Sequence, residues 1–179
     1  MTTSFNPAYD YNRTRHLGNI GEKIFMTHFT EYDACLVDEQ TDLHTQYAGI
    51  DHVIEILWDS DLENFIGKRV YTTDVKYDKK SDETDRVVYE LESSKDNIGW
   101  FFKLEVDTFT HVLPKRKKMI IVKAPEVRTF YKENPNLFYH PAGHIGPTAT
   151  GNAKKTIIAC LPVDILEEQD FSHTINLGD

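Results

Sequence analysis

The stretch RVYTTDVKYD, residues 69–78, is the most informative part of this chain because it joins the alternation of a β-strand to two charged side chains. Asp74 and Lys76 are separated by one residue, so on an extended strand they point to the same face. The opposite face carries aromatic and β-branched residues, namely Tyr71, Thr73, Val75 and Tyr77. The pattern predicts a half-buried strand with one polar side that is available for chemistry.

A further carboxylate, Asp51, lies upstream in GIDHVIEIL, residues 49–57, which also has the pattern of a strand. Mg²⁺ prefers oxygen ligands and keeps several waters, so two carboxylates and a substrate phosphate are a sufficient set of ligands. The ammonium of a nearby lysine can orient an attacking water or offset developing negative charge. We therefore expect Asp51 and Asp74 to bind Mg²⁺ or Mn²⁺, with Lys76 acting beside them.

A helix is expected upstream of both strands, from Arg13 to about Phe29, because apolar residues recur there at helical spacing. Gly18 and Gly21 lower the helix propensity of this segment. Glycine also permits close approach of another backbone. We expect the helix to lie tightly on the sheet near Glu22.

The ordered set of Glu22 in GNIGEKIF, Asp51 in AGIDHVIEI and Asp74-Val75-Lys76 in TTDVKYD resembles the PD-(D/E)xK nuclease superfamily, which has the restriction-endonuclease-like fold. In that family a helix with an acidic residue leads into a strand with a metal-binding Asp, and a strand with (D/E)xK follows. Gly49-Ile50 precedes Asp51 where the family name has proline. The resemblance covers roughly residues 12–123 and points to small restriction-like or phage-type members.

The resemblance implies an αβββαβ core and a metal-dependent endonuclease. Asp51 and Asp74 would hold Mg²⁺ or Mn²⁺ with the Val75 carbonyl, and Lys76 would position or activate water. Glu22 would bind a second cation or a metal-bound water. The reaction would be the in-line hydrolysis of a phosphodiester, with DNA favoured over RNA as the substrate.

The rest of the chain is typical of an α/β (α+β) domain with a central mixed sheet flanked by helices. One domain is expected, because 179 residues of which 40% are hydrophobic suffice for one core. We expect an N-terminal arm over 1–12, a hairpin connection over 59–69, and a long glycine-rich loop over 136–153. Strands are expected at 34–38, 48–57, 69–77, 86–93, 107–114, 117–124 and 154–162, and helices at 125–135 and 163–169, the last being terminal.

Composition narrows the class of protein. Cys35 and Cys160 lie among apolar residues without a CxxC motif, which favours buried, reduced thiols and a cytoplasmic location. No apolar run is long enough to cross a bilayer, so no membrane partner is expected.

The net charge of −9 argues against a nuclease, because proteins that bind polyanions usually carry a basic surplus. Local clusters of cations can still steer a phosphate backbone. Such clusters are expected to contact nucleic acid at Lys115, Arg116, Lys117 and Lys118 and at Lys154 and Lys155. The other interpretation is that the KRKK turn, residues 115–118, is a solvated surface.

Several neighbouring residues have two interpretations. Glu90 or Glu92 would face the metal or hold Lys76 if their strand neighbours the Asp74 strand in a suitable register. The aromatic run Trp100, Phe101 and Phe102 would stack on bases or pack in the core. Tyr139, His140 and His144 lie in the glycine-rich loop, which would be a flap over the substrate.

Two other functions remain open from sequence. The first is a catalytically inactive acidic protein of the same fold that binds a partner protein or mimics nucleic acid. The second is a junction resolvase, which would use the same site as a homodimer. Convergence of the Asp51 and Asp74 carboxylates would separate the enzyme from the inactive protein.

Overall fold

The computed structural model describes residues 7–30, 35–39, 52–60, 65–77, 79–94, 97–141, 145–146 and 154–178. The helices are α1 (Pro7–Thr30), α3 (Lys79–Thr84), α4 (Trp100–Lys103), α5 (Ala124–Glu133) and α6 (Val163–Glu167), with 3₁₀ turns η1 (Pro114–Arg116) and η2 (Pro135–Leu137). The strands are β1 (Cys35–Glu39), β2 (His52–Ser60), β3 (Phe65–Lys76), β4 (Arg86–Ser94), β5 (Asn97–Ile98), β6 (Thr108–Leu113), β7 (Lys118–Lys123), β8 (Ile145–Gly146), β9 (Lys154–Lys155), β10 (Ile157–Pro162) and β11 (Ser172–Asn176).

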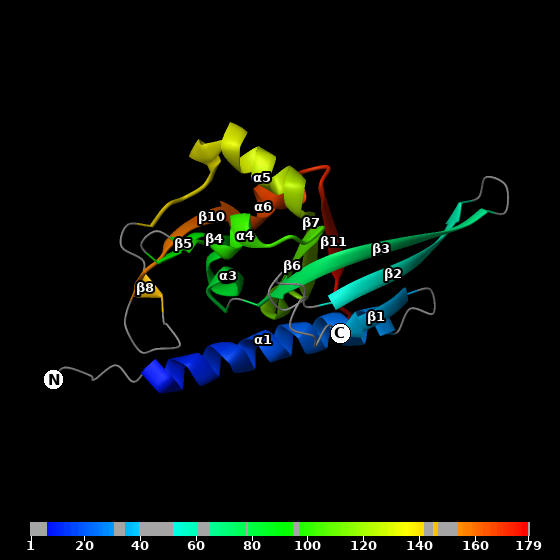
Figure 1. Ribbon diagram of the computed structural model, residues 1–179, viewed down its shortest axis with the longest axis horizontal. Coiled ribbons are helices and arrows are strands. Elements are labelled where there is room, and N and C mark those ends of the chain that lie inside the picture. Colours follow the sequence, from blue (N-terminus) through cyan, green and yellow to red (C-terminus); the bar gives the residue numbers. More distant parts are fainter. Residues whose placement is uncertain are drawn as a thin grey trace.

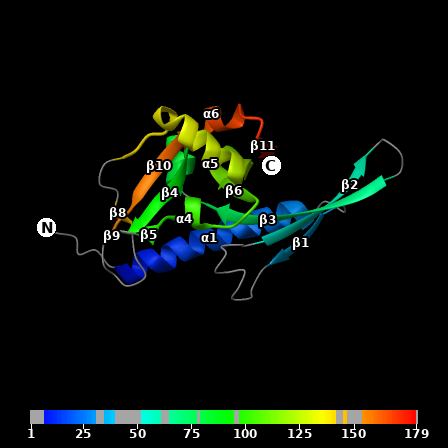
Figure 2. The same ribbon diagram turned by 45° about the horizontal axis from the view of Figure 1, so that its top comes forward.

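A six-stranded mixed sheet forms the centre of the fold, with strand order β1-β2-β3-β6-β7-β11. The pairing of β3 with β6 is parallel, and the other pairings in this sheet are antiparallel. A second sheet has the order β10-β4-β5, and β8 pairs with β9. Figures 1 and 2 show α1 along one side of the central sheet, with β4, β10 and α5 on the other side.

The parallel pairing of β3 and β6 requires a crossover, because parallel strands cannot be joined by a tight turn. Residues 77–107 form this crossover, which contains α3, β4, β5 and α4. Asp107, at the C-terminal end of the crossover, is tied to Thr72 within β3: the Asp107 carboxylate accepts hydrogen bonds from the Thr72 backbone N–H at 2.8 Å and hydroxyl at 2.9 Å. The Asp107 N–H in turn donates to the Thr72 carbonyl at 3.1 Å.

One face of the central sheet packs against α1. Phe25 and Phe29 of the helix form a buried cluster with Val75, Val112 and Met119. Gly21 brings the helix closest to β3, because a Cβ atom at this position would stand 2.7 Å from the Cβ of Tyr77. The expected tight contact next to Glu22 is therefore confirmed.

The opposite face carries the larger hydrophobic core, which joins the two sheets. Its central members are fully buried aromatic and aliphatic side chains, among them Tyr89, Phe101, Phe109, Ile120 and Leu161. Phe101 is thus a core residue, as one interpretation of the aromatic run expected, whereas Phe102 is 38% exposed. Cys160 is buried as expected, and the side chain of Cys35 lies outside the described part of the structure.

The expected class of α and β structure around a central mixed sheet is confirmed, with four local differences. α1 begins at Pro7, so much of the expected arm over 1–12 is helical. The expected connection over 59–69 is largely strand, because the ladder of β2 and β3 continues to Ser60 and Phe65 and cross-strand pairing outweighs the local Asp and Gly content. β4 belongs to the second sheet, and β11 follows the helix that was expected to be terminal.

None of the helices within the described residues is long and apolar enough to cross a membrane.

Candidate active site

Asp74 and Lys76 lie at the C-terminal end of β3, side by side with β6. In the parallel register Asp74 is opposite Phe109 and Lys76 is opposite His111. Val75, between them, packs against α1, so the two charged side chains face away from α1 and toward the second sheet.

The two charged groups form an ion pair in a largely dry environment. Lys76 Nζ donates to Asp74 Oδ1 at 2.6 Å, and the Lys76 and Asp74 side chains are 33% and 3% exposed. A buried carboxylate is costly unless a charge or hydrogen bond compensates it. The predicted placement of both residues on one face of a strand is confirmed.

Lys76 also contacts residues of the crossover. Its ammonium lies 5.2 Å from the centre of the Trp100 ring. Burial raises the pKa of the Glu90 carboxyl, and this effect is opposed by a hydrogen bond from the Trp100 backbone N–H and by the positive charge of Lys76. Glu90 belongs to β4, which is not hydrogen-bonded to β3. The charges of Glu90 and Lys76 therefore interact, although Glu90 comes from the second sheet and not from a neighbouring strand.

A second polar group beside Lys76 was not foreseen from sequence. His111 is 4% exposed, and burial together with the charge of Lys76 lowers its pKa to about 3. Its ring meets the Tyr89 ring edge-on at 5.2 Å, and burial raises the pKa of the Tyr89 hydroxyl. Within the described residues, His111 Nε2 and the Tyr89 hydroxyl have no hydrogen-bond partner. In the sequence, the one indication of this buried polar residue is that His111 alternates with Phe109 along an apolar strand.

The other expected site residues are placed as follows. Asp51 lies outside the described residues. Glu22 is on α1, the helix that packs on the Val75 face of the sheet, and its place at the site stays a prediction. Among the described residues, no group of three or more His, Cys, Asp or Glu side chains could hold a metal ion. Asp51 is not among these residues.

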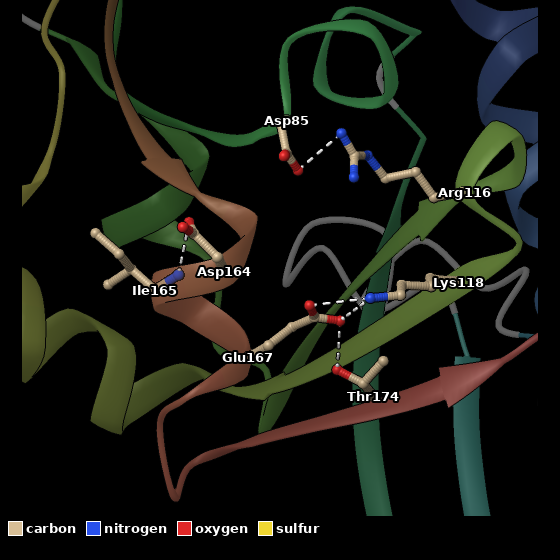
Figure 3. A network of polar contacts seen from close by, with 7 residues as sticks. All are labelled: Asp85, Arg116, Lys118, Asp164, Ile165, Glu167 and Thr174. Carbon is tan, nitrogen blue, oxygen red and sulfur yellow. Dashed lines mark hydrogen bonds and ion pairs between the residues drawn. The ribbon is translucent and has the colours of Figure 1, made fainter.

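The KRKK turn is paired with acidic side chains. Lys115 Nζ lies 3.0 Å from Glu83 Oε1, and Arg116 lies 2.9 Å from Asp85 Oδ1. Figure 3 shows the Arg116 pair and, nearby, the two hydrogen bonds from Lys118 to Glu167 at 2.8 and 3.0 Å. These contacts give the turn a structural role, and its contact with nucleic acid stays a prediction.

Three further expectations concern the glycine-rich region. Lys154 and Lys155 form β9, and their side chains lie outside the described residues, as does His144. Tyr139 is 53% exposed, pairs its backbone with Cys160, and has the Arg86 guanidinium 4.9 Å from its ring centre. Tyr139 therefore lies against the second sheet, and no contact described here gives it a role at a substrate.

A comparison of the chain with protein-family models, with curated proteins and with solved structures found no match. Function is therefore inferred from the residues of this chain. The geometry provides a buried carboxylate, a lysine held beside it, and a partly buried second carboxylate from the crossover. The lysine of such a group can donate a charge-assisted hydrogen bond to an anionic group.

Proposed function

We propose that this protein is a metal-dependent nuclease of the PD-(D/E)xK type, which hydrolyses phosphodiester bonds and acts on DNA in preference to RNA. The observation that carries the proposal is the Asp74 and Lys76 pair at the end of the central strand β3, with Asp74 only 2% exposed. A carboxylate buried against a lysine at this position is the arrangement that the Asp-x-Lys motif would need.

The order of elements supports the same family. α1 is followed by the antiparallel strands β1, β2 and β3, by the helix-containing crossover, and by β6 beside β3. When the strands of the second sheet are left out, the order of helices and strands along the chain is αβββαβ. The long helix lies on one face of the mixed sheet, as the resemblance implies (Figure 1).

Asp51 directly precedes β2, the strand that pairs with β3. His52 is the first described residue of β2, and its partner is Thr73. Asp74 directly follows Thr73 in the chain. The proposal therefore takes Asp51 as the second carboxylate of the site.

The donor set suits a hard divalent cation, because its members are carboxylate oxygens. Asp51 and Asp74 would hold Mg²⁺ or Mn²⁺ with the Val75 carbonyl, and the ion would supply charge stabilisation to a phosphate. Lys76 would donate a hydrogen bond to the water or to a phosphate oxygen. Glu22 would contribute only if it reached the same site from α1, so it is the least supported member of the set.

The test is a cleavage panel of plasmid DNA, linear DNA, four-way junctions and RNA, with Mg²⁺ or Mn²⁺ and with chelator. We expect metal-dependent cleavage of DNA that Lys76→Ala abolishes while metal affinity is kept. Lys23→Ala is the matched control, because Lys23 is an exposed lysine of α1. Turnover by Lys76→Ala equal to that of the parent would remove the lysine from the mechanism.

Metal binding is measured separately by titration calorimetry with Mn²⁺. The double variant Asp51→Ala, Asp74→Ala should lose the binding and the accompanying rise in melting temperature. If the parent protein bound no Mn²⁺ at millimolar concentration, the nuclease proposal would fail.

A second candidate is an inactive acidic protein of the same fold that binds a partner protein or mimics nucleic acid. It is favoured by the ion pairs that neutralise Lys115, Arg116 and Lys118 in a chain with a net charge of −9. It predicts no cleavage of any member of the panel. Cleavage restricted to four-way junctions, by a dimer, would instead identify a junction resolvase.

A further inference from the structure

The corner between β5 and α4 is pressed against β4 at Glu90. The N–H of Gly99 donates to the Leu91 carbonyl at 2.9 Å. A Cβ atom at Gly99 would overlap the carbonyl oxygen of Glu90 and stand 2.6 Å from the carbonyl carbon of Leu91. Because these are backbone atoms, they cannot move aside, and only glycine fits here.

This close approach places two groups of the corner at the Asp74 and Lys76 pair. The backbone N–H of Trp100 donates to the Glu90 carboxylate, whose charge interacts with that of Lys76. The Trp100 ring lies 5.2 Å from the Lys76 ammonium. The same ammonium is bonded to Asp74 at 2.6 Å. Lys76 is therefore bonded to a carboxylate of its own strand and lies near an indole ring of the crossover, and its charge interacts with that of Glu90.

We propose that Glu90 and Trp100 are positioning residues that hold the Lys76 ammonium beside Asp74, so that it presents a fixed hydrogen-bond donor to the substrate phosphate. The consequence for cleavage rests on the proposed nuclease function, whereas the positioning itself does not. Neither residue is expected to touch the reacting atoms, because both act through Lys76.

The physical reason is the flexibility of lysine. Its ammonium is a point charge on a four-carbon stem, with large rotamer entropy and no preferred direction. An indole ring is the most favourable aromatic surface for a cation. The bond to Asp74, the ring face and the attraction of the Glu90 charge together restrict the ammonium more than Asp74 alone would, and orientation of a catalytic group contributes strongly to rate.

The first experiment measures cleavage kinetics. Trp100→Leu removes the ring, Trp100→Phe keeps a weaker one, and Glu90→Gln removes the charge while keeping the shape. Turnover should fall about tenfold in Trp100→Leu and in Glu90→Gln, which corresponds to about 1.4 kcal/mol in the barrier. Trp100→Phe should recover part of the loss, and KM should change little in all three.

Glu92→Gln is the matched control for Glu90→Gln. Glu92 is two residues further along β4, where it pairs with Ile157 of β10 and Ile98 of β5. Its variant should cleave like the parent. Equal losses in the two glutamine variants, or full turnover in Trp100→Leu, would overturn the proposal. The unfolding free energies of all variants show whether a loss of turnover is caused by destabilisation of the fold.

The second experiment needs no activity. The chain has two tryptophans, so Trp58→Phe leaves Trp100 as the only indole. In this background Lys76→Met should change the Trp100 emission, because the charge over the ring is removed, and Glu90→Gln should cause a smaller change. Lys103→Met, an exposed lysine of α4 itself, is the control and should leave the emission unchanged.

The two experiments separate the two proposals. If the parent cleaves nothing, the nuclease function is rejected, and the emission alone decides whether Trp100 holds Lys76. If the parent cleaves DNA but Lys76→Met and Lys103→Met have the same emission, the positioning proposal is rejected and the nuclease stands.

Discussion

Replacing Gly18 and Gly21 by alanine, one at a time, tests whether α1 is seated directly on the strand that carries Asp74 and Lys76. Both glycines lie within α1, so each variant gains about 0.5–1 kcal/mol from lower backbone entropy in the unfolded chain. At Gly18 the new Cβ meets only Glu22 Oε1, at 3.9 Å. At Gly21 it stands 2.7 Å from Tyr77 Cβ, which is fixed to the backbone.

Overpacking of this kind costs about 1–3 kcal/mol. Because the helix-propensity gain is common to both variants, the difference between them isolates the steric cost, about 1–3 kcal/mol. We expect Gly18→Ala to be more stable than the parent and Gly21→Ala to be less stable. For a chain of this size each kcal/mol corresponds to about 2–4 °C in the melting temperature.

The assay is equilibrium unfolding in urea, followed by circular dichroism, with equal m-values required for all three proteins. If both variants are stabilised to the same extent, α1 is not in contact with Tyr77. The layered arrangement beneath the candidate site would then be incorrect. A loss in Gly18→Ala as large as that in Gly21→Ala would show that glycine is needed in this helix for a reason other than the contact.

Three further predictions follow from contacts described above. Lys118→Gln should lower the unfolding free energy by about 1 kcal/mol, because the variant loses the partly exposed ion pair with Glu167. Added salt should reduce the difference in unfolding free energy between variant and parent. Equal unfolding free energies at low salt would contradict this prediction. The pKa of His111 is about 3 in the folded protein against 6.5 ordinarily, so as the pH falls the unfolded chain takes up the proton first and the folded state loses stability. His111→Phe should lessen this loss between about pH 6.5 and pH 3, by up to about 1.4 kcal/mol per pH unit. Parallel plots of unfolding free energy against pH for the variant and the parent would refute the prediction. Gly99→Ala should lower the melting temperature more than Gly18→Ala changes it, as thermal unfolding would show, because its Cβ meets backbone atoms of β4.

The alternation around Asp74 and Lys76 was sufficient to predict their strand and their common face, and the glycines Gly18 and Gly21 predicted the contact of α1 near Glu22. These features depend on local periodicity and on the small size of glycine. The place of β4 could not be read in the same way, because an alternating strand fits equally well into either of two sheets. His111 was missed for a related reason: only the parallel register of β3 and β6 brings it opposite Lys76, and register between distant strands leaves no local signal.

The hydrogen bonds between Thr72 and Asp107 make the crossover, residues 77–107, a module that can be exchanged as a unit. Both ends of residues 77–107 are held at β3, one because it continues the strand and the other because Asp107 is bonded to Thr72, so the segment between them can change without altering the distance it must span. Asp74 and Lys76 belong to β3 of the central sheet, whereas Glu90 and Trp100 belong to the module. Substitutions inside the module could therefore retune the surroundings of the lysine while the strand that bears it stays the same.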